Sequence, residues 1–310
     1  DSMIRIQNIP LPVGGDLEPL RRKAARTLGV RPGALKEIQL VRQSIDARKK
    51  QDVHYVYTVD VEVEQEQAVL SACTARNVSL VHPAPYEFPK VERRSSTMPV
   101  VVGMGPAGLF AALFLARNGI PCVVLERGQD VDTRTKDVEG FWKDGTLNPG
   151  SNVQFGEGGA GTFSDGKLTT GTHDPRIAAV MDALIGAGAP EDVKWSHKPH
   201  IGTDILRQVV KTIRQELISL GCDVRFGSCL TGLEYSGGQL SGIWVEGPEG
   251  RYRLDCDALV LAPGHSARDT FRMLEEAGVP MEQKSFAIGV RIEHKQKLIS
   301  QAQYGPFWDK

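Results

Sequence analysis

The sequence predicts an α/β protein in which a small α+β domain precedes a larger domain built on a parallel sheet. Three observations support this prediction. Strand-like and helix-like patterns alternate over the first part of the chain, a proline-rich charged stretch follows, and a run of valines then leads into a glycine-rich turn. Because parallel strands are buried on both faces, an uninterrupted β-branched run is typical of them.

The first domain is expected to have the element order βαββαβ. Its strands are predicted at residues 4–7, 36–45, 53–63 and 78–81, and its helices at 16–29, capped by Asp16, and 64–76. From Val53 to Val63, valine or tyrosine occupies every second position, which is the period of a strand with one buried face. This element order is that of a ferredoxin-like domain. We assign residues 1–88 to this domain and residues 89–98 to a linker.

A strand, a glycine turn, a helix and a second strand follow the linker. The strand Val100–Val102 comes directly before Gly103, Gly105 and Gly108, which have the spacing G-x-G-x-x-G. In dinucleotide-binding folds these glycines allow a tight turn, close approach of the backbone to a pyrophosphate, and close packing of the helix on the sheet. Glu126 ends the second strand, where a carboxylate can accept hydrogen bonds from ribose hydroxyls and would repel a 2′-phosphate. We therefore predict a Rossmann-like nucleotide site without NADP.

Further features favour FAD over NAD in this site. Pro106 follows the second glycine, and residues 256–269 have the pattern of a strand that ends in a small-residue turn. Residues 221–234 predict a third parallel strand. Short stretches at 233–234, 240–246 and 251–255 predict an antiparallel meander inserted into the domain. These features resemble flavoproteins with two dinucleotide-binding domains, in which the residue near Leu230 meets adenine through its backbone.

The loop VQFGEGGAGTFSDGKL, residues 153–168, fits two nucleotide-binding patterns, but its context excludes both. No apolar strand precedes it, no apolar helix follows it, and Leu168 stands where a P-loop needs Ser or Thr. We predict instead that its backbone lies against a flavin, whose polar edge can bond exposed N–H groups. Lys167 would stabilise negative charge on the reduced ring. A flexible surface loop is the alternative.

The whole chain resembles the N-terminal part of a family of bacterial FAD-dependent dehydrogenases with a glutathione-reductase-like fold. The resemblance rests on the motifs GMGPAGLFAAL, SNVQFGEGGAGTFSDGKL, KPHIGTDIL, LAPGHSARDTF and FAIGVRIEH. It implies that the nucleotide half of FAD is held by Gly103, Gly105, Pro106, Ala107, Gly108, Glu126, Arg127 and Arg134. It places near the ribityl chain and ring Gly158, Gly159, Gly161, Thr162, Ser164, Gly166, Lys167, Ala262, Pro263, Gly264 and His265.

The resemblance also divides the second part of the chain. Residues 99–170 and 203–284 would form the FAD-binding domain, and residues 171–202 and 285–310 part of a substrate domain. Such flavoproteins end in a Gly-Asp motif that holds the ribityl phosphate, whereas the Gly-Asp pair of this chain, Gly15–Asp16, lies in the first domain. We therefore expect the chain to be shortened at its C-terminus.

His265 is the preferred candidate for chemistry, with Lys167 as the second. His265 follows the strand-end turn, where the crevice of an open parallel sheet lies, and could act as a proton donor or acceptor. A structural hydrogen-bonding role is the alternative. Other titratable candidates on the substrate side are His173, His197, His200, Arg291 and His294.

The expected function is hydride transfer between FAD and a substrate, with NAD(P)H as the candidate electron donor. Two alternatives stay open. An FAD-dependent RNA-modifying protein would use the basic residues of the first domain, and a non-catalytic scaffold would only bind the nucleotide. The basic residues are Arg21, Arg22, Lys23, Arg26, Arg42, Arg48, Lys49 and Lys50. A solvated helix face and hairpin is the simpler interpretation of that cluster.

Composition narrows the class of protein further. A net charge of -1 argues against binding of a polyanion by the whole protein. The five cysteines form no C-x-x-C pair, so we expect neither a metal site nor a dithiol centre. The chain shows no signal-peptide pattern, and its longest apolar run, residues 106–116, is too short to span a bilayer. These features predict a cytoplasmic protein without a membrane partner.

Overall fold

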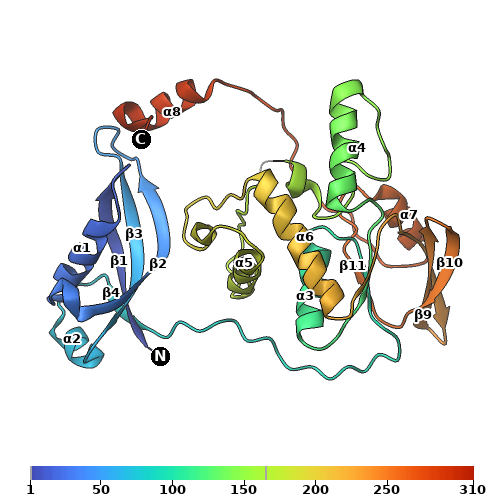
Figure 1. Cartoon of the computed structure of the whole chain (residues 1–310), viewed down its shortest axis with the longest axis horizontal. Coiled ribbons are helices and arrows are strands. Elements are labelled where there is room, and N and C mark those ends of the chain that lie inside the picture. Colours follow the sequence, from blue (N-terminus) through green and yellow to red (C-terminus); the bar gives the residue numbers. More distant parts are fainter. Residues whose placement is uncertain (1, 165) are drawn as a thin grey trace. The chain divides into compact units, whose positions relative to one another are not determined.

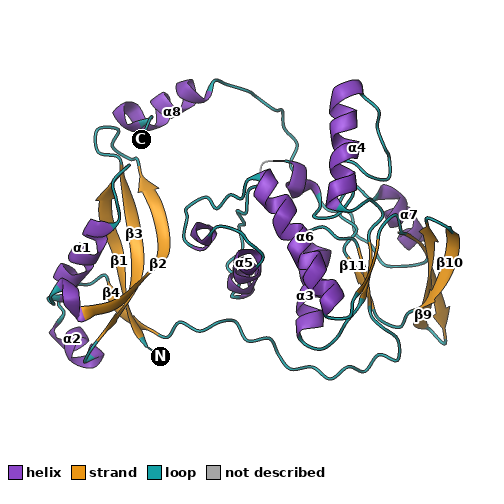
Figure 2. Ribbon diagram, viewed as in Figure 1, coloured by secondary structure: helices purple, strands orange, loops and turns teal. Residues whose placement is uncertain are grey.

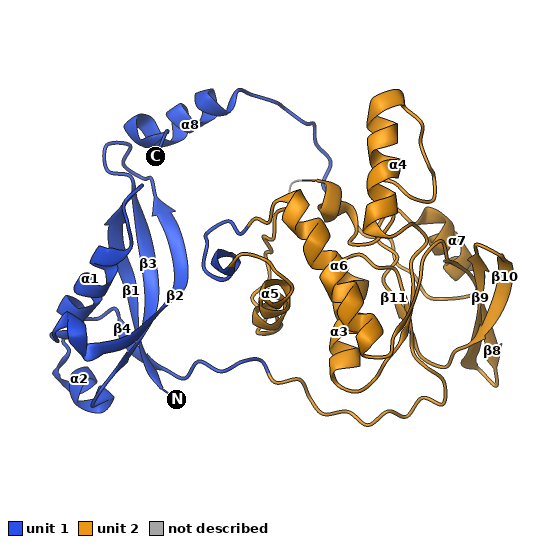
Figure 3. Ribbon diagram, viewed as in Figure 1, with its two compact units in different colours: residues 1–86, 191–199, 286–310 blue, residues 87–190, 200–285 orange. Residues whose placement is uncertain are grey.

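The computed structural model describes residues 2–164 and 166–310, which form two compact units of mixed α/β structure (Figures 2 and 3). Unit 1 extends to Tyr86 and also contains Glu191–Pro199 and Phe286–Lys310. Unit 2 contains Glu87–Pro190 and His200–Ser285. The predicted linker and residues 171–190 therefore group with the second unit.

Unit 1 is built on a four-stranded antiparallel sheet in the order β2-β3-β1-β4 (Figure 1). The strands are β1 (Met3–Pro12), β2 (Leu35–Asp46), β3 (His54–Val63) and β4 (Val78–Val81). The helices are α1 (Glu18–Leu28), η1 (Pro32–Ala34) and α2 (Glu66–Ala72). The elements follow one another in the predicted order βαββαβ.

Strand β1 is longer than the sequence predicts. Its pairing with β3 shifts register between Ile6 and Ile9, where Asn8 has a φ of 57°. The pairing with β4 ends at Ile6, and Gln7 bonds Asn77 just before β4, so Pro10 and Pro12 lie beyond this pairing and cost no ladder hydrogen bond there. Strand β1 therefore continues past Asn8 and through two prolines, which are residues that ordinarily end a strand.

The core of unit 1 lies between the sheet and α1. Val59 and Val61 of β3 are fully buried, as the period of two predicts, and they pack in one cluster with Leu20 and Ala24 of α1. Helix α1 ends at Gly29 as expected, in the left-handed conformation that glycine tolerates best. Its cap differs from the prediction: the side chain of Asp16 bonds the N–H of Glu18, but the capping residue is Leu17.

Unit 2 contains a parallel sheet in the order β11-β5-β6-β7. The strands are β5 (Val100–Val102), β6 (Val123–Leu125), β7 (Asp223–Arg225) and β11 (Leu259–Leu261). Strand β5 lies between β11 and β6 and is buried along its whole length. Helix α3 (Pro106–Arg117) follows it and packs beside α6 (Thr203–Ser219). The predicted central strand is therefore present at the predicted residues.

An antiparallel meander covers one face of this sheet. It consists of β8 (Cys229–Ser236), β9 (Gln239–Gly247) and β10 (Gly250–Asp255), in the order β10-β9-β8. Leu230 and Ile243 share a buried cluster with Val102 and Val123. Helix α7 (Arg268–Glu276) follows β11 and contacts β8. The meander therefore packs against side chains of the parallel strands.

The remaining elements are helical. They are α4 (Val131–Asp144), η2 (Ala160–Phe163), α5 (Arg176–Gly186), η3 (Glu191–Lys194), α8 (Gln296–Tyr304) and η4 (Gly305–Phe307). Between α7 and α8, the side chains of Phe286, Ile288, Val290 and Ile292 are 70–90% exposed on an extended stretch. Within residues 2–164 and 166–310, none of the helices has both the length and the apolar character needed to cross a bilayer.

Gly108 of α3 is required by packing. A Cβ there would overlap the carbonyl oxygen of Gly103 and lie 2.8 Å from its carbonyl carbon. We expect Gly108→Ala to lower the free energy of unfolding by about 3 kcal/mol, because backbone atoms would have to move. Urea denaturation measures this change.

The matched control is Gly140→Ala, the same substitution within α4. A Cβ at Gly140 meets no atom within 4 Å. Alanine is a better helix former than glycine by about 1 kcal/mol, so this variant should be unchanged or slightly more stable. Equal effects of the two substitutions would contradict the packing role of Gly108.

Candidate functional site

The site is built around the turn between β5 and α3. Gly103, with a φ of 98°, donates its N–H to the carbonyl of Leu125 at 2.7 Å, and a Cβ there would overlap the carbonyl oxygen of Ala262. Gly105 differs, because its φ of -73° suits any residue and the nearest atom to a Cβ would be Cα of Gly159 at 3.7 Å. Packing within the chain therefore explains Gly103 but not Gly105, whose missing side chain leaves room in the adjoining cavity.

The carboxylate of Glu126 connects this turn to the end of β6. One oxygen accepts a hydrogen bond from the N–H of Met104 at 2.8 Å, and the other accepts one from the N–H of Gly128 at 2.8 Å. The residue is only 4% exposed. Each carboxylate oxygen has a second acceptor position, so the group can still receive donors from a ligand.

The glycine-rich loop packs directly against the turn. The N–H of Gly158 donates to the carbonyl of Met104 at 2.8 Å. A Cβ on Gly159 would lie 3.0 Å from Cα of Gly105, and one on Gly128 would lie 2.6 Å from Cα of Gly156. The loop that the sequence associated with the cofactor is thus in backbone contact with the nucleotide turn.

Arg134 of α4 holds the loop from the protein interior. Its buried guanidinium donates to the carbonyls of Asn152, Glu157 and Val153 at 2.9, 2.7 and 3.1 Å, and burial lowers its pKa to about 10. It also lies over the ring of Phe163. The sequence assigned Arg134 to the FAD nucleotide, whereas the structure has its nitrogens bonded to the loop backbone.

Glu157 is a buried residue of the site that the sequence analysis did not select. Its fully buried carboxylate accepts a hydrogen bond from the N–H of Val131 at 2.6 Å and pairs with Arg214 of α6 at 2.8 Å. Burial raises the pKa of this carboxyl group. The only hint in the sequence was a single acidic residue among small ones. Its partner Arg214 could not be foreseen, because it comes from a helix far along the chain. Together these residues connect the loop to α4 and α6.

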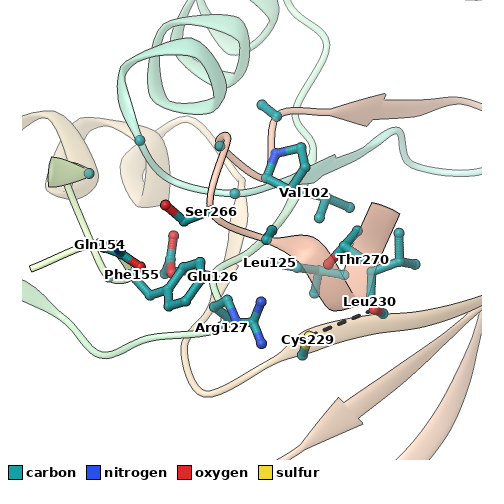
Figure 4. Close-up of a pocket in the computed structure, with 18 of the residues that line it drawn as sticks. Val102, Leu125, Glu126, Arg127, Gln154, Phe155, Cys229, Leu230, Ser266 and Thr270 are labelled. Carbon is teal, nitrogen blue, oxygen red and sulfur yellow. Dashed lines mark hydrogen bonds between the residues drawn. The ribbon is translucent and has the colours of Figure 1, made fainter. Parts of the chain in front are cut away.

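These segments enclose a cavity of about 810 Å³, part of which is open to solvent (Figure 4). Its predicted lining residues are Gly103, Gly105, Pro106, Glu126, Arg127, Gly159, Leu230, Ala262, Pro263, Gly264 and His265. Residues that the sequence analysis did not select include Gln154, Phe155, Cys229, Ser266 and Thr270.

Arg127 forms one wall of the cavity. Its guanidinium makes two hydrogen bonds to Asp269 of α7, at 2.9 and 2.7 Å, and lies 4.2 Å from the ring centre of Phe155. The pairing with Arg127 lowers the pKa of Asp269. In Figure 4 the side chains of Glu126, Arg127 and Phe155 lie close together. Arg127 therefore stacks on the loop and bonds α7 at the same time.

The two predicted catalytic residues line different cavities. His265 is exposed at the first cavity, with Nε2 3.3 Å from the hydroxyl of Ser266. Lys167 lines a second cavity together with Gly158, Gly161, Gly166 and Pro106. Neither cavity is lined by Ala107, Gly108, Arg134, Thr162 or Ser164. Thr162 and Gly108 are buried, and Ala107 and Ser164 are exposed.

Replacing Arg134 tests its role in holding the loop. Arg134→Met removes the donor from one buried and two partly buried hydrogen bonds, so we expect the free energy of unfolding to fall by about 3 kcal/mol. Arg117→Met is the control, because Arg117 pairs with Glu216 at the surface, where such pairs contribute about 1 kcal/mol or less. Urea denaturation without added cofactor compares them, and similar losses would contradict the interpretation.

Comparison with known proteins agrees with this geometry. Residues 96–287 match the family described as FAD binding domain, and residues 3–62 match a domain of unknown function, DUF8436. An uncharacterized protein of Clostridium beijerinckii is 49% identical over 303 residues, which are 97% of this chain and 56% of that protein. The chain thus spans about half the length of this curated relative.

Solved structures with detectable similarity have low sequence identity to this chain. Thermovibrio ammonificans THI4 has 17% identity and a TM-score of 0.39, with 59% of this chain and 64% of that chain covered. A flavoprotein/dehydrogenase of Cytophaga hutchinsonii has 17% identity and a TM-score of 0.35, with 58% and 42% covered. The open position beside Gly105 and the carboxylate of Glu126 fit a dinucleotide. The chain belongs to the FAD binding domain family, and its cofactor is FAD.

Proposed function

We propose that the chain forms the FAD-holding part of an FAD-dependent oxidoreductase, and that the cavity beside Gly105 receives the nucleotide half of the cofactor. One observation carries this proposal: the glycine turn, the buried carboxylate of Glu126 and the start of α3 meet at the ends of parallel strands β5 and β6. Ligands of open parallel sheets bind at this edge.

The residues around the turn have complementary roles in this proposal. The first turn of α3 offers N–H groups without helical partners and the positive end of the helix dipole, which suit a diphosphate. Glu126 would accept hydrogen bonds from ribose hydroxyls, and the backbone at Leu230 would meet adenine. Arg127, fixed by Asp269, would cover this side of the cavity.

The flavin side is assigned to the glycine-rich loop and the turn after β11. FAD supplies the capacity to accept and release a hydride. His265, exposed at the cavity, would hold or move a proton at its imidazole, and Lys167 would stabilise negative charge from the other side of the loop. Dehydrogenase chemistry with NAD(P)H as donor is proposed from the sequence resemblance.

We also propose that this chain is the N-terminal part of a longer protein with a ferredoxin-like first domain. Its span of 56% of the Clostridium beijerinckii relative supports the first statement. The element order and the strand order β2-β3-β1-β4 support the second. A substrate domain would include residues 171–202 and 285–310.

Gly105 provides a direct test of cofactor binding. We expect Gly105→Val to leave the free energy of unfolding within about 1 kcal/mol, because the nearest atom to a Cβ there, Cα of Gly159, lies at an ordinary contact distance of 3.7 Å. FAD affinity should fall by about a hundredfold, corresponding to about 2.7 kcal/mol. Titration of flavin fluorescence measures the affinity.

Gly171→Val is the matched control, because a Cβ at Gly171 meets no atom within 4 Å and the residue does not line the cavity beside Gly105. It should bind FAD as the unchanged chain does. Equal affinity of the Gly105 and Gly171 variants would show that the cofactor does not approach the turn.

His265 tests the chemical assignment. We expect His265→Asn to retain FAD, because the side chain is exposed and bonds only Ser266. Reduction of the bound flavin by NADH or NADPH should slow by about a hundredfold if the imidazole moves the proton. Stopped-flow bleaching of the flavin absorbance gives the rate. An unchanged rate with normal FAD content would remove His265 from the mechanism.

A further inference from the structure

Unit 2 contains a second, largely apolar cavity of about 1150 Å³, part of which is open to solvent. Its walls come from three helices and the glycine-rich loop. The apolar side chains are Leu109 and Phe110 of α3, Ile177, Val180, Met181 and Leu184 of α5, and Leu206 and Val210 of α6. Leu109, Leu184, Leu206 and Val210 are buried, whereas the other four are partly exposed.

An apolar occupant suits this space, because transfer of apolar surface out of water is favourable. Water fills a cavity well only where it finds two to four polar partners, and the helical walls offer almost none. The apolar side chains of the three helices therefore favour binding of a molecule that is largely apolar.

Polar groups gather at one part of the lining. They are Lys167, Thr170, Thr172, Asp174 and Arg176, in the segment between the loop and α5. Arg176 pairs with Asp174 at 2.6 Å. A ligand with one polar end would direct that end toward this segment, because a buried polar group without a partner costs free energy.

The second cavity adjoins the proposed cofactor cavity. Pro106 lines both of them. In the loop, Gly159 and Ala160 line the first cavity, whereas Gly158 and Gly161 line the second. The backbone of residues 158–161 therefore borders both spaces, and a substrate must approach a cofactor at such a place.

We propose that this second cavity binds the substrate, a compact aromatic or alicyclic molecule with one polar group. The binding site itself follows from the cavity, while the statement that its ligand is oxidised or reduced rests on the proposed function. FAD would lie on one side of the glycine-rich loop and the apolar molecule on the other, near Lys167.

The probe for this site is 1-anilinonaphthalene-8-sulfonate, an apolar aromatic anion whose fluorescence reports binding. We expect one saturable site on the chain. Val180→Trp places an indole ring in the cavity and should weaken this binding by about tenfold, corresponding to about 1.4 kcal/mol. Met181→Glu places a carboxylate on the same wall and should weaken it similarly. Thermal unfolding checks that both variants fold.

Two control variants distinguish this cavity from other apolar surfaces. Ile218→Trp alters an exposed residue of α6 outside the cavity, and Ile288→Asp alters the exposed stretch between α7 and α8. Both should bind the probe as the unchanged chain does. Equal affinity in all four variants would overturn the proposal, and so would a loss in Ile288→Asp alone.

Two further measurements separate the possible failures. FAD titration of Val180→Trp should give the affinity of the unchanged chain. If the unchanged chain itself does not bind FAD, the proposed function is refuted, but the proposed binding in this cavity is not. The longer Clostridium beijerinckii relative should also bind the probe. Binding to this chain but not to that relative would show that polypeptide fills the cavity, which would overturn the proposal.

Discussion

The carboxylate of Glu126 is the interaction on which the site depends. Its two oxygens bond the N–H groups of Met104 and Gly128, so a single side chain fixes both the turn after β5 and the loop after β6. The backbone of the same residue bonds Arg225 and Ser228, at the end of β7 and the start of the meander. Hydrogen bonds to a buried charged group contribute about 1.5–3 kcal/mol each. Three segments thus receive their positions from one residue.

Around this carboxylate the site is assembled from backbone. Gly128 and Gly156 are in contact, as are Gly105 and Gly159, and any side chain at Gly128 would force the loop away. Because glycines form these contacts, they contribute no side chains that could hold the loop in place. Arg134 and Glu157 supply that support from behind, through carbonyl groups and the start of α4.

The sequence predicts the parts of the site that depend on local pattern. Val100–Val102, the glycine turn and Glu126 are where the spacing indicated, because strand, turn and helix leave separate periodic signals. Pairings between distant segments leave no such signal. The charge of Arg134 suits a phosphate ligand, so the sequence alone suggests that role. Only the structure shows that its guanidinium is buried and already bonded to the loop carbonyls. The separation of His265 from Lys167 also depends on how the loop folds.

The alternating stretch of Phe286, Ile288, Val290 and Ile292 affects how this chain behaves in solution. An extended segment with one apolar face and unpaired backbone groups is a template for pairing between molecules. Dilution and a polar substitution on that face both oppose such pairing.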